Sequence, residues 1–315
     1  MLLTESLDHN IYQVPLVDLK TIYRSTGYVI KEEKTILIET GAAPSNDIIH
    51  NSLKELDIQP EQVDYIAVTH IHLDHAGGAG LLMEQCPNAT LLVHQRGAKH
   101  MADPEKLIAG ARQVYGNAFD SLFKPILPIP AERIKVMEDG DTLDLGNNRI
   151  LHFLDAPGHA FHHLVVNDPT SKGLFSGDNA GIFFRQLYDD QGIAFSLPVT
   201  APTQFVPEIM VKTMDRLISL NPERVYFTHY GMAENGVALL QQAKKLVSFF
   251  GDDCAKHYQK ERSFEKLFEF IRERLYSELA ALGVTGDIPE KGSLDNDIKL
   301  NIQGVIAYVE KLERG

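Results

Sequence analysis

The chain of 315 residues carries 43 acidic and 30 basic side chains, which gives a formal net charge of −13. This negative charge repels phosphate backbones and argues against nucleic acid as a partner. The hydrophobic content of 44% indicates a globular protein. The sequence has no apolar run of about 18 residues, so we expect no contact with a membrane.

The N-terminal segment Met1–Asn10 has no basic stretch and no long apolar core, so it does not resemble a signal peptide. The sequence has two cysteines, Cys86 and Cys254, too few for a disulfide framework. We expect Cys86 to be a small buried hydrophobic residue. Both observations suit a reducing compartment and predict a cytoplasmic protein.

Short strands alternate with helices over the first part of the chain. Apolar runs bounded by turn residues predict strands at Ile11–Leu16, Ile22–Ile30, Thr35–Glu39, Val63–Thr69 and Thr90–His94. Apolar residues at helical spacing predict helices at Asn46–Leu56, Ala79–Cys86 and Ala98–Tyr115. The pattern breaks at Leu127–Pro130, where two prolines stand close together.

A second series of elements follows this break. Its predicted strands are Arg133–Met137, Thr142–Leu145, Arg149–Asp155, His163–Asn167, Gly173–Ser176 and Val225–Thr228. A helix is predicted at Glu208–Leu220 and is stopped by Asn221-Pro222. Residues of metal-ligand type follow strands in both series, but the similarity between them is too low to define a repeat.

Strand patterns end near residue 236, and only helical spacing continues. Helices are predicted at Leu239–Phe250, Phe264–Leu282 and Asp295–Leu312. We therefore predict a first domain at 1–236 and a C-terminal helical extension at 237–315. The apolar faces of these helices must be buried against the rest of the chain or against a second subunit in a homodimer.

The strongest chemical signal is a cluster of four metal-ligand residues directly after an apolar strand. His70 and His72 are two positions apart, and residues so spaced on an extended chain point the same way, so both can reach one ion. The glycines that follow allow a tight turn, which can aim Asp74 and His75 at a neighbouring position. The structural alternative, a polar turn, would be costly with three imidazoles and a carboxylate.

Three later strand ends each supply one further residue of the same type. His159 lies in Pro157-Gly158-His159, Asp178 in Ser176-Gly177-Asp178, and His229 in Thr228-His229-Tyr230-Gly231. Each of them alone has an ordinary structural explanation. Together with the first cluster they supply enough ligands for two divalent ions, and imidazole with carboxylate suits zinc, with iron or manganese also compatible.

These motifs, in this order over about residues 10–235, resemble those of the metallo-β-lactamase-fold hydrolases, and most closely the glyoxalase II, lactonase and phosphodiesterase branches. The resemblance implies an α/β fold, a four-layer αββα sandwich with the metal site at one edge. It implies a first ion held by His70, His72 and His159, a second held by Asp74, His75 and His229, and a bridge formed by Asp178.

Two ions at such a site acidify a shared water, and the bridging hydroxide attacks the carbonyl of a small ester, lactone or thioester. Asp74 is a candidate to orient this nucleophile or to carry a proton. The developing oxyanion needs a further hydrogen-bond donor, and the metal ligands need supporting groups. For one of these roles we favour His163, which lies four residues after His159. We expect the side chain of His162 to point to the other side. The other candidates for this role are Tyr115, Tyr188, Tyr230 and His100.

Several alternatives remain open. A phosphodiesterase would use the same metals, and a ligand-sensing protein or an iron-dependent redox protein could retain the site. Glyoxalase II proteins carry basic glutathione-binding residues, and the C-terminal region of this sequence does not match them. Lactonases place a tyrosine at the site, and Tyr188 is a candidate for that tyrosine. Flavin-dependent di-iron reductases have glutamate in place of His72 and a flavodoxin domain, and the sequence shows neither.

The segment Ala180–Thr203 is rich in apolar residues and follows Asp178. One interpretation is an apolar lid over a small hydrophobic substrate. The other is a packing surface for the C-terminal helices or a second subunit. The residues concerned are Ile182, Phe183, Phe184, Leu187, Tyr188, Phe195 and Leu197.

Overall fold

The computed structural model describes residues 4–202, 204–285 and 291–314. The chain divides into two compact units that are interleaved along the sequence. Unit 1 comprises Met1–Asp155, His162–Gly177 and Tyr226–Gly231, and unit 2 comprises Ala156–Phe161, Asp178–Val225 and Met232–Gly315. The predicted domains 1–236 and 237–315 follow one another along the sequence, whereas these units are interleaved. The two domains remain a prediction.

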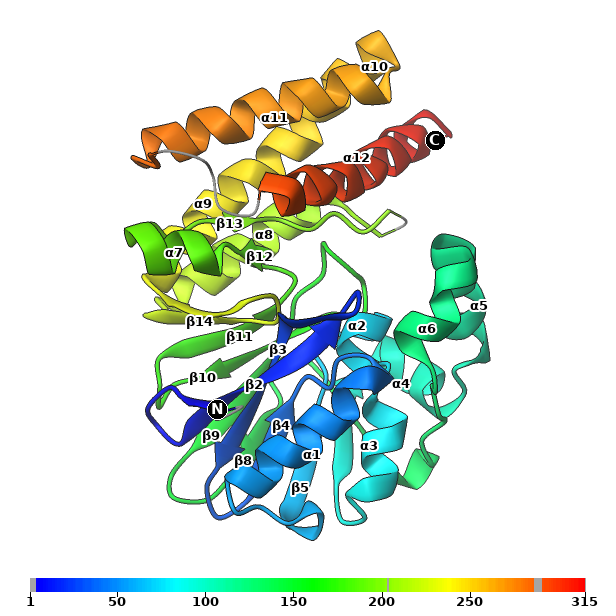
Figure 1. Cartoon of the computed structure of the whole chain (residues 1–315), viewed down its shortest axis with the longest axis vertical. Coiled ribbons are helices and arrows are strands. Elements are labelled where there is room, and N and C mark those ends of the chain that lie inside the picture. Colours follow the sequence, from blue (N-terminus) through cyan, green and yellow to red (C-terminus); the bar gives the residue numbers. More distant parts are fainter. Residues whose placement is uncertain (1–3, 203, 286–290, 315) are drawn as a thin grey trace. The chain divides into compact units, whose positions relative to one another are not determined.

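Two sheets form the framework (Figure 1). The strands of the first sheet lie in sequence order and are β1 (Glu5–Ser6), β2 (Ile11–Asp18), β3 (Thr21–Lys31), β4 (Thr35–Ile38), β5 (Val63–Ala67), β6 (Thr90–His94) and β7 (Ile134–Met137). Its strands are antiparallel from β1 to β4 and parallel from β4 to β7. The second sheet has the order β15-β14-β11-β10-β9-β8. Its strands are β8 (Thr142–Asp144), β9 (Ile150–Asp155), β10 (Leu164–Asp168), β11 (Gly173–Gly177), β14 (Arg224–Phe227) and β15 (Gly231–Glu234).

Aromatic residues join the two sheets within unit 1. The ring of Tyr28 on β3 lies 5.3 Å from that of Phe175 on β11, in an edge contact, and both side chains are buried. The hydroxyl of Tyr28 donates to the backbone oxygen of Phe227 at 2.5 Å, so the polar end of this buried ring is satisfied. The contact fixes the end of β14, two residues before His229.

Helices cover the first sheet within unit 1. Leu53 of α1 (Asn46–Glu55) and Leu82 of α3 (Ala79–Gln85) belong to one buried apolar cluster with Leu37, Ile66 and Leu91 of the sheet.

The predicted helix Ala98–Tyr115 is wrong as a single element. Two helices, α4 (Gln95–Ala102) and α5 (Glu105–Tyr115), are separated at Asp103-Pro104, because proline ends a helix that precedes it. The other short helices of unit 1 are α2 (Leu73–Ala76) and α6 (Phe119–Phe123).

Unit 2 is mainly helical. Its helices are α7 (Arg185–Gln191), α8 (Pro207–Ser219), α9 (Gly236–Phe249), α10 (Ala255–Glu261), α11 (Phe264–Ala281) and α12 (Lys291–Arg314), and its hairpin is β12 (Ile182–Phe183) with β13 (Ser196–Leu197). The apolar segment Ala180–Thr203 therefore contains a hairpin and a helix, although Thr203 lies outside the described residues. Within the described parts of the chain, no helix is both long enough and apolar enough to cross a membrane.

The apolar segment between residues 182 and 197 packs inside unit 2. Phe184, Leu187 and Phe195 are buried in one cluster with Leu275 of α11 and Ile302 of α12. Of the two interpretations of this segment, the structure supports the packing surface for the C-terminal helices. The burial of these side chains leaves them unable to act as an exposed lid in this conformation.

Both cysteines are buried, as the sequence predicts for Cys86. Burial raises the pKa of the Cys86 thiol to about 11 from 9.0, and burial also raises the pKa of Cys254. A protonated, buried thiol is a poor nucleophile. Neither cysteine is therefore a candidate for catalysis.

The buried thiols generate a test of the fold. Both cysteines should resist iodoacetamide in the native protein at neutral pH and should react after unfolding in urea. Above pH 9 the unfolded chain loses the Cys86 proton first, so the free energy of unfolding should fall as the pH rises from 9.0 towards about 11. This loss should be smaller in Cys86→Ala. Rapid alkylation of both thiols in the native protein would contradict their burial.

Candidate metal centre

The first two histidines of the motif converge on one point. Strand β5 ends at Ala67, and α2 begins at Leu73, so the chain between them is extended and His72 has φ −61° and ψ 148°. The Nε2 atom of His70 lies 2.8 Å from the Nδ1 atom of His72. Nitrogen atoms brought this close from two rings form a ready pair of donors for a single ion.

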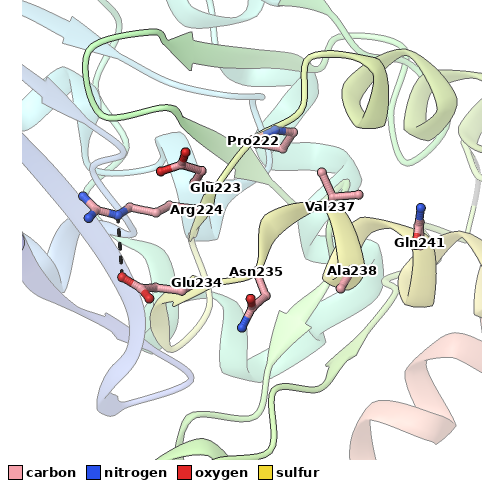
Figure 2. Close-up of a pocket in the computed structure, with 8 residues that line it drawn as sticks. All are labelled: Pro222, Glu223, Arg224, Glu234, Asn235, Val237, Ala238 and Gln241. Atoms are coloured by element: carbon pink, nitrogen blue, oxygen red, sulfur yellow. Dashed lines mark ion pairs between the residues drawn. The ribbon is translucent and has the colours of Figure 1, made fainter.

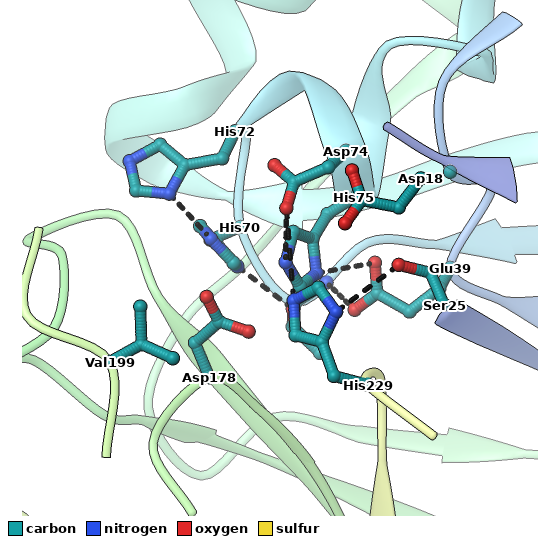
Figure 3. Close-up of polar contacts among 12 residues, drawn as sticks. Asp18, Ser25, Glu39, His70, His72, Asp74, His75, Asp178, Val199 and His229 are labelled. Carbon is teal, nitrogen blue, oxygen red and sulfur yellow. Dashed lines mark hydrogen bonds and ion pairs between the residues drawn. The ribbon is translucent and has the colours of Figure 1, made fainter. Parts of the chain in front are cut away.

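Asp74, His75 and His229 form a second group within unit 1 (Figure 3). The Oδ2 atom of Asp74 lies 3.6 Å from Nε2 of His75 and 3.7 Å from Nε2 of His229. One donor atom from each of the three residues lies within 4.8 Å of the other two. His75 is fully buried, whereas the side chain of Asp74 keeps 23% of its exposure. Asp74 is therefore the member of this group that solvent can reach.

Glu39 supports His75 from behind. It follows β4, is buried, and its Oε2 atom lies 3.3 Å from Nδ1 of His75, while its Oε1 atom accepts from the backbone N–H of Thr69 at 3.0 Å. A carboxylate at this distance favours a proton on Nδ1 and therefore favours Nε2 as the ligand nitrogen. The same side chain also fixes the backbone directly before His70, so it connects the two groups of ligands.

His229 is held by the edge of β3. The Nδ1 atom of His229 lies 3.2 Å from Oγ of Ser25, and the two residues form a β-bridge. Arg24 donates to the hydroxyl of Tyr230 at 2.9 Å and to Asp18 at 2.8 Å. The contacts at His229 and at the next residue, Tyr230, hold the ring and its segment of chain against β3.

His70 has supporting groups of its own. Its Nδ1 atom lies 3.1 Å from Oγ1 of Thr69, and the ring of His163 stacks on it at 4.8 Å between centroids. His163 is fully buried. The expectation that His162 points the other way is wrong: β10 begins only at Leu164, so both histidines lie in the preceding turn, and the ring of His162 lies 6.0 Å from that of His70.

Unit 2 contributes a second pair of ligand type. The Nε2 atom of His159 lies 3.4 Å from Oδ2 of Asp178, and both residues are buried. The Nδ1 atom of His159 contacts the backbone oxygen of Val199 at 3.0 Å. Its preceding residue, Gly158, has φ +133°, and a Cβ there would lie 2.4 Å from Cα of Met210, so only glycine fits the turn.

The chemistry of the donor set fits divalent metal ions. In unit 1, four imidazoles and a carboxylate are gathered in two groups. Three of the imidazoles contact a supporting group through Nδ1, namely His70 with Thr69, His75 with Glu39 and His229 with Ser25. Buried histidines that serve only packing do not need this convergence. The chain has two His/Asp clusters, and they are consistent with a dinuclear metal site.

A family comparison agrees with this chemistry. The sequence model described as the metallo-beta-lactamase superfamily matches residues 21–229, which is more than half of the chain. The chain belongs to the metallo-beta-lactamase superfamily. The glyoxalase II and lactonase branches within this superfamily are not distinguished by the match.

The chain is similar to several superfamily members. It is 27% identical over 242 residues to a metallo-beta-lactamase fold-containing protein of Sulfurisphaera tokodaii, covering 76% of this chain and 84% of that protein. It is 29% identical over 175 residues to the anaerobic nitric oxide reductase flavorubredoxin of Vibrio vulnificus, covering 54% of this chain. The chain spans only 30% of the length of that flavorubredoxin.

Solved structures of the superfamily share the fold. A metallo-beta-lactamase family protein from Thermus thermophilus superposes with a TM-score of 0.67 at 16% identity, covering 98% of this chain and 95% of the other. An archaeal metallo-beta-lactamase superfamily protein from Sulfolobus tokodaii gives 0.65 at 23% identity, covering 95% and 98%. The predicted metallo-β-lactamase fold, two sheets flanked by helices with a C-terminal helical part, is confirmed.

Sequence reasoning missed the residues that support the ligands of this superfamily site. Glu39 could have been identified from the sequence, because it is an acidic residue that directly follows the three apolar residues Ile36–Ile38 of β4. Ser25 and Arg24 gave none, since a serine and an arginine within a strand are ordinary. Their role depends on the pairing of β3 with the segment around His229, which the sequence does not show.

His94 and the remaining candidate side chains, His100, Tyr115 and Tyr188, have other surroundings. His94 caps α4, where its Nδ1 accepts from the N–H of Arg96, and its Nε2 lies 3.1 Å from Asp155. Burial lowers the pKa of His94 in spite of this carboxylate, and burial also lowers the pKa of His100. Tyr115 packs on Phe123, and Tyr188 on Phe183. None of these contacts is with a metal-ligand residue.

A separate cavity of about 490 Å³ lies at the start of α9 in unit 2 (Figure 2). Arg224 and Glu234 form a loose ion pair at its wall, at 3.9 Å. The other lining residues are Pro222, Glu223, Asn235, Val237, Ala238 and Gln241. None of the seven predicted ligands is among the described residues that line it, so this cavity is not the metal centre.

The contact of Glu39 with His75 predicts a specific loss. Glu39→Gln keeps the size of the side chain but removes its charge, so we expect zinc to bind about 10- to 100-fold more weakly at the second group of ligands. Competition with a chromophoric chelator, starting from metal-stripped protein, measures this affinity.

Glu84→Gln, at an exposed position of α3, is the matched control and should bind zinc as the wild type does. Wild-type affinity in Glu39→Gln would show that the carboxylate does not tune the ligand.

Proposed function

We propose that the protein is a dinuclear metal-dependent hydrolase that acts on a small ester, lactone or thioester. The observation that supports this most directly is the convergence of His70, His72, Asp74, His75 and His229 within unit 1, with a supporting group behind each of three imidazoles. We propose His70, His72 and His159 as ligands of the first ion, Asp74, His75 and His229 as ligands of the second, and Asp178 as the bridge.

The proportions of the donors support zinc as the resident metal. Five of the seven proposed ligands are imidazoles and two are carboxylates, a set that zinc accepts and that iron or manganese also tolerates. The acidic composition supports a small-molecule substrate over a nucleic acid. Within the superfamily, we favour a role close to the glyoxalase II and lactonase branches.

Two bound ions would supply an acidified water and would polarise the oxygen that gains charge during attack. The residues of the chain then have separate tasks. Asp74, the most exposed ligand of its group, is placed to orient the attacking water and to pass a proton to the leaving group. His163 is buried against His70, so its task in this proposal is to orient that ligand.

An iron-dependent redox protein is the second candidate. The similarity to an anaerobic nitric oxide reductase flavorubredoxin over 54% of the chain supports it. The residue at position 72 argues against it, because the flavin-dependent di-iron reductases carry glutamate where this chain has histidine. The hydrolase therefore remains the better supported function.

A substrate panel tests the proposal. The zinc-loaded protein should hydrolyse members of a set of lactones, thioesters and nitrophenyl esters, and activity should disappear on removal of the metal with a chelator and return with zinc. Hydrolysis confined to nitrophenyl phosphodiesters would replace the proposed substrate class. Inactivity of the fully loaded protein against the whole panel would contradict the hydrolase.

Asp74→Asn tests the role of the exposed carboxylate. We expect a loss of kcat of about 100-fold or more, the usual contribution of a positioned acid or base, in protein that still contains metal. Asp57→Asn is a matched control at an exposed position with φ +52°, which asparagine also adopts. Near-normal turnover of Asp74→Asn with normal metal content would exclude the proton-transfer role.

A further inference from the structure

Helix α12 contacts one short segment of unit 2 through two hydrogen bonds. The backbone N–H of Thr200 donates to Oδ1 of Asn301 at 2.8 Å, and the hydroxyl of Thr200 donates to the backbone oxygen of Asn301 at 2.8 Å. Thr200 and Asn301 are each only 2% exposed. Because both bonds are shielded from water, they fix the position of the segment against the helix.

A glycine of the helix permits this close approach. Gly304 lies three residues after Asn301, and therefore on the same face of α12. A Cβ at this position would lie 2.2 Å from Oγ1 of Thr200 and 2.6 Å from its backbone oxygen. Any larger residue would push the segment away from the helix, so the sequence of α12 is matched to this contact.

The neighbouring residue of the segment orients His159. The backbone oxygen of Val199 lies 3.0 Å from Nδ1 of His159 and is placed to accept its proton. With the proton held at Nδ1, Nε2 becomes the nitrogen available to a metal, and it faces Asp178 at 3.4 Å.

Other contacts hold the backbone around His159 independently of α12. The N–H of Val206 donates to the oxygen of Gly158 at 3.0 Å, and Thr213 of α8 donates to the oxygen of Pro157 at 2.6 Å. The turn therefore keeps its place through α8, while the ring of His159 takes its orientation from Val199. A disturbance of α12 should change the ring and spare the turn.

We propose that α12 positions the metal ligand His159 through Thr200 and Val199, and that Asn301 is the positioning residue. This inference rests on the proposed function only in taking His159 as a metal ligand. It gives the C-terminal helices a role in the metal site itself, in addition to burying apolar surface in unit 2.

Zinc affinity of the full-length, metal-stripped protein tests the inference. In Asn301→Ala one of two ions should bind about 10- to 100-fold more weakly, as expected when an outer contact of a ligand is lost, while the other binds as in the wild type. Asn301→Asp keeps an oxygen that can accept from Thr200 and should restore most of the affinity. Asn296→Ala, at an exposed asparagine of the same helix, is the matched control and should leave both ions unchanged.

A second variant covers a failure of Asn301→Ala to fold. Thr200→Val keeps the shape of the side chain and removes only the hydrogen bond from the hydroxyl to the backbone oxygen of Asn301. The backbone hydrogen bond to Oδ1 of Asn301 remains, so this variant should weaken binding of the same ion to a smaller degree. Wild-type affinity for both ions in folded Asn301→Ala, or in Thr200→Val where the alanine variant does not fold, would overturn the inference. A wild-type protein that binds no zinc or cobalt would instead contradict the proposed function, and the inference with it.

Discussion

A buried imidazole that binds metal through one nitrogen needs a partner for the other, and this constraint shapes much of the structure. Without such a partner the ring would bury an unsatisfied polar atom and could rotate or change tautomer. In this protein Thr69 serves His70, Glu39 serves His75, and Ser25 serves His229. In unit 2 the backbone oxygen of Val199 serves His159.

The partners come from parts of the chain far apart in sequence. Ser25 lies on β3, Glu39 follows β4, and the segment carrying Val199 depends on α12 near the C-terminus. A metal centre of this kind therefore needs a framework that is already folded around it. The close packing of Tyr28 with Phe175, and the hydrogen bond from Tyr28 to Phe227, show how the sheets supply that framework in unit 1.

The sequence predicts most of the fold because its signals are local. Strands such as Thr90–His94 match the structure residue for residue, since apolar runs and turn residues mark their limits. The ligand motif could be read because His70 and His72 are two positions apart on an extended chain. The supporting residues could not be predicted in the same way, since the pairing of Ser25 with His229 spans 204 positions. Helix α7 was missed because the apolar residues of its segment are compatible with a lid as well as with a packing surface, and only their burial in the structure decides between the two.

The central claim is a site for two metal ions, and elemental analysis tests it most directly. Protein purified without added metal, and then loaded with zinc and freed of excess, should contain close to two ions per chain. Such a stoichiometry, with zinc predominating in the protein as purified, agrees with a dinuclear hydrolase. A single tightly bound iron, with no second ion taken up on loading, would contradict the account and favour a redox protein.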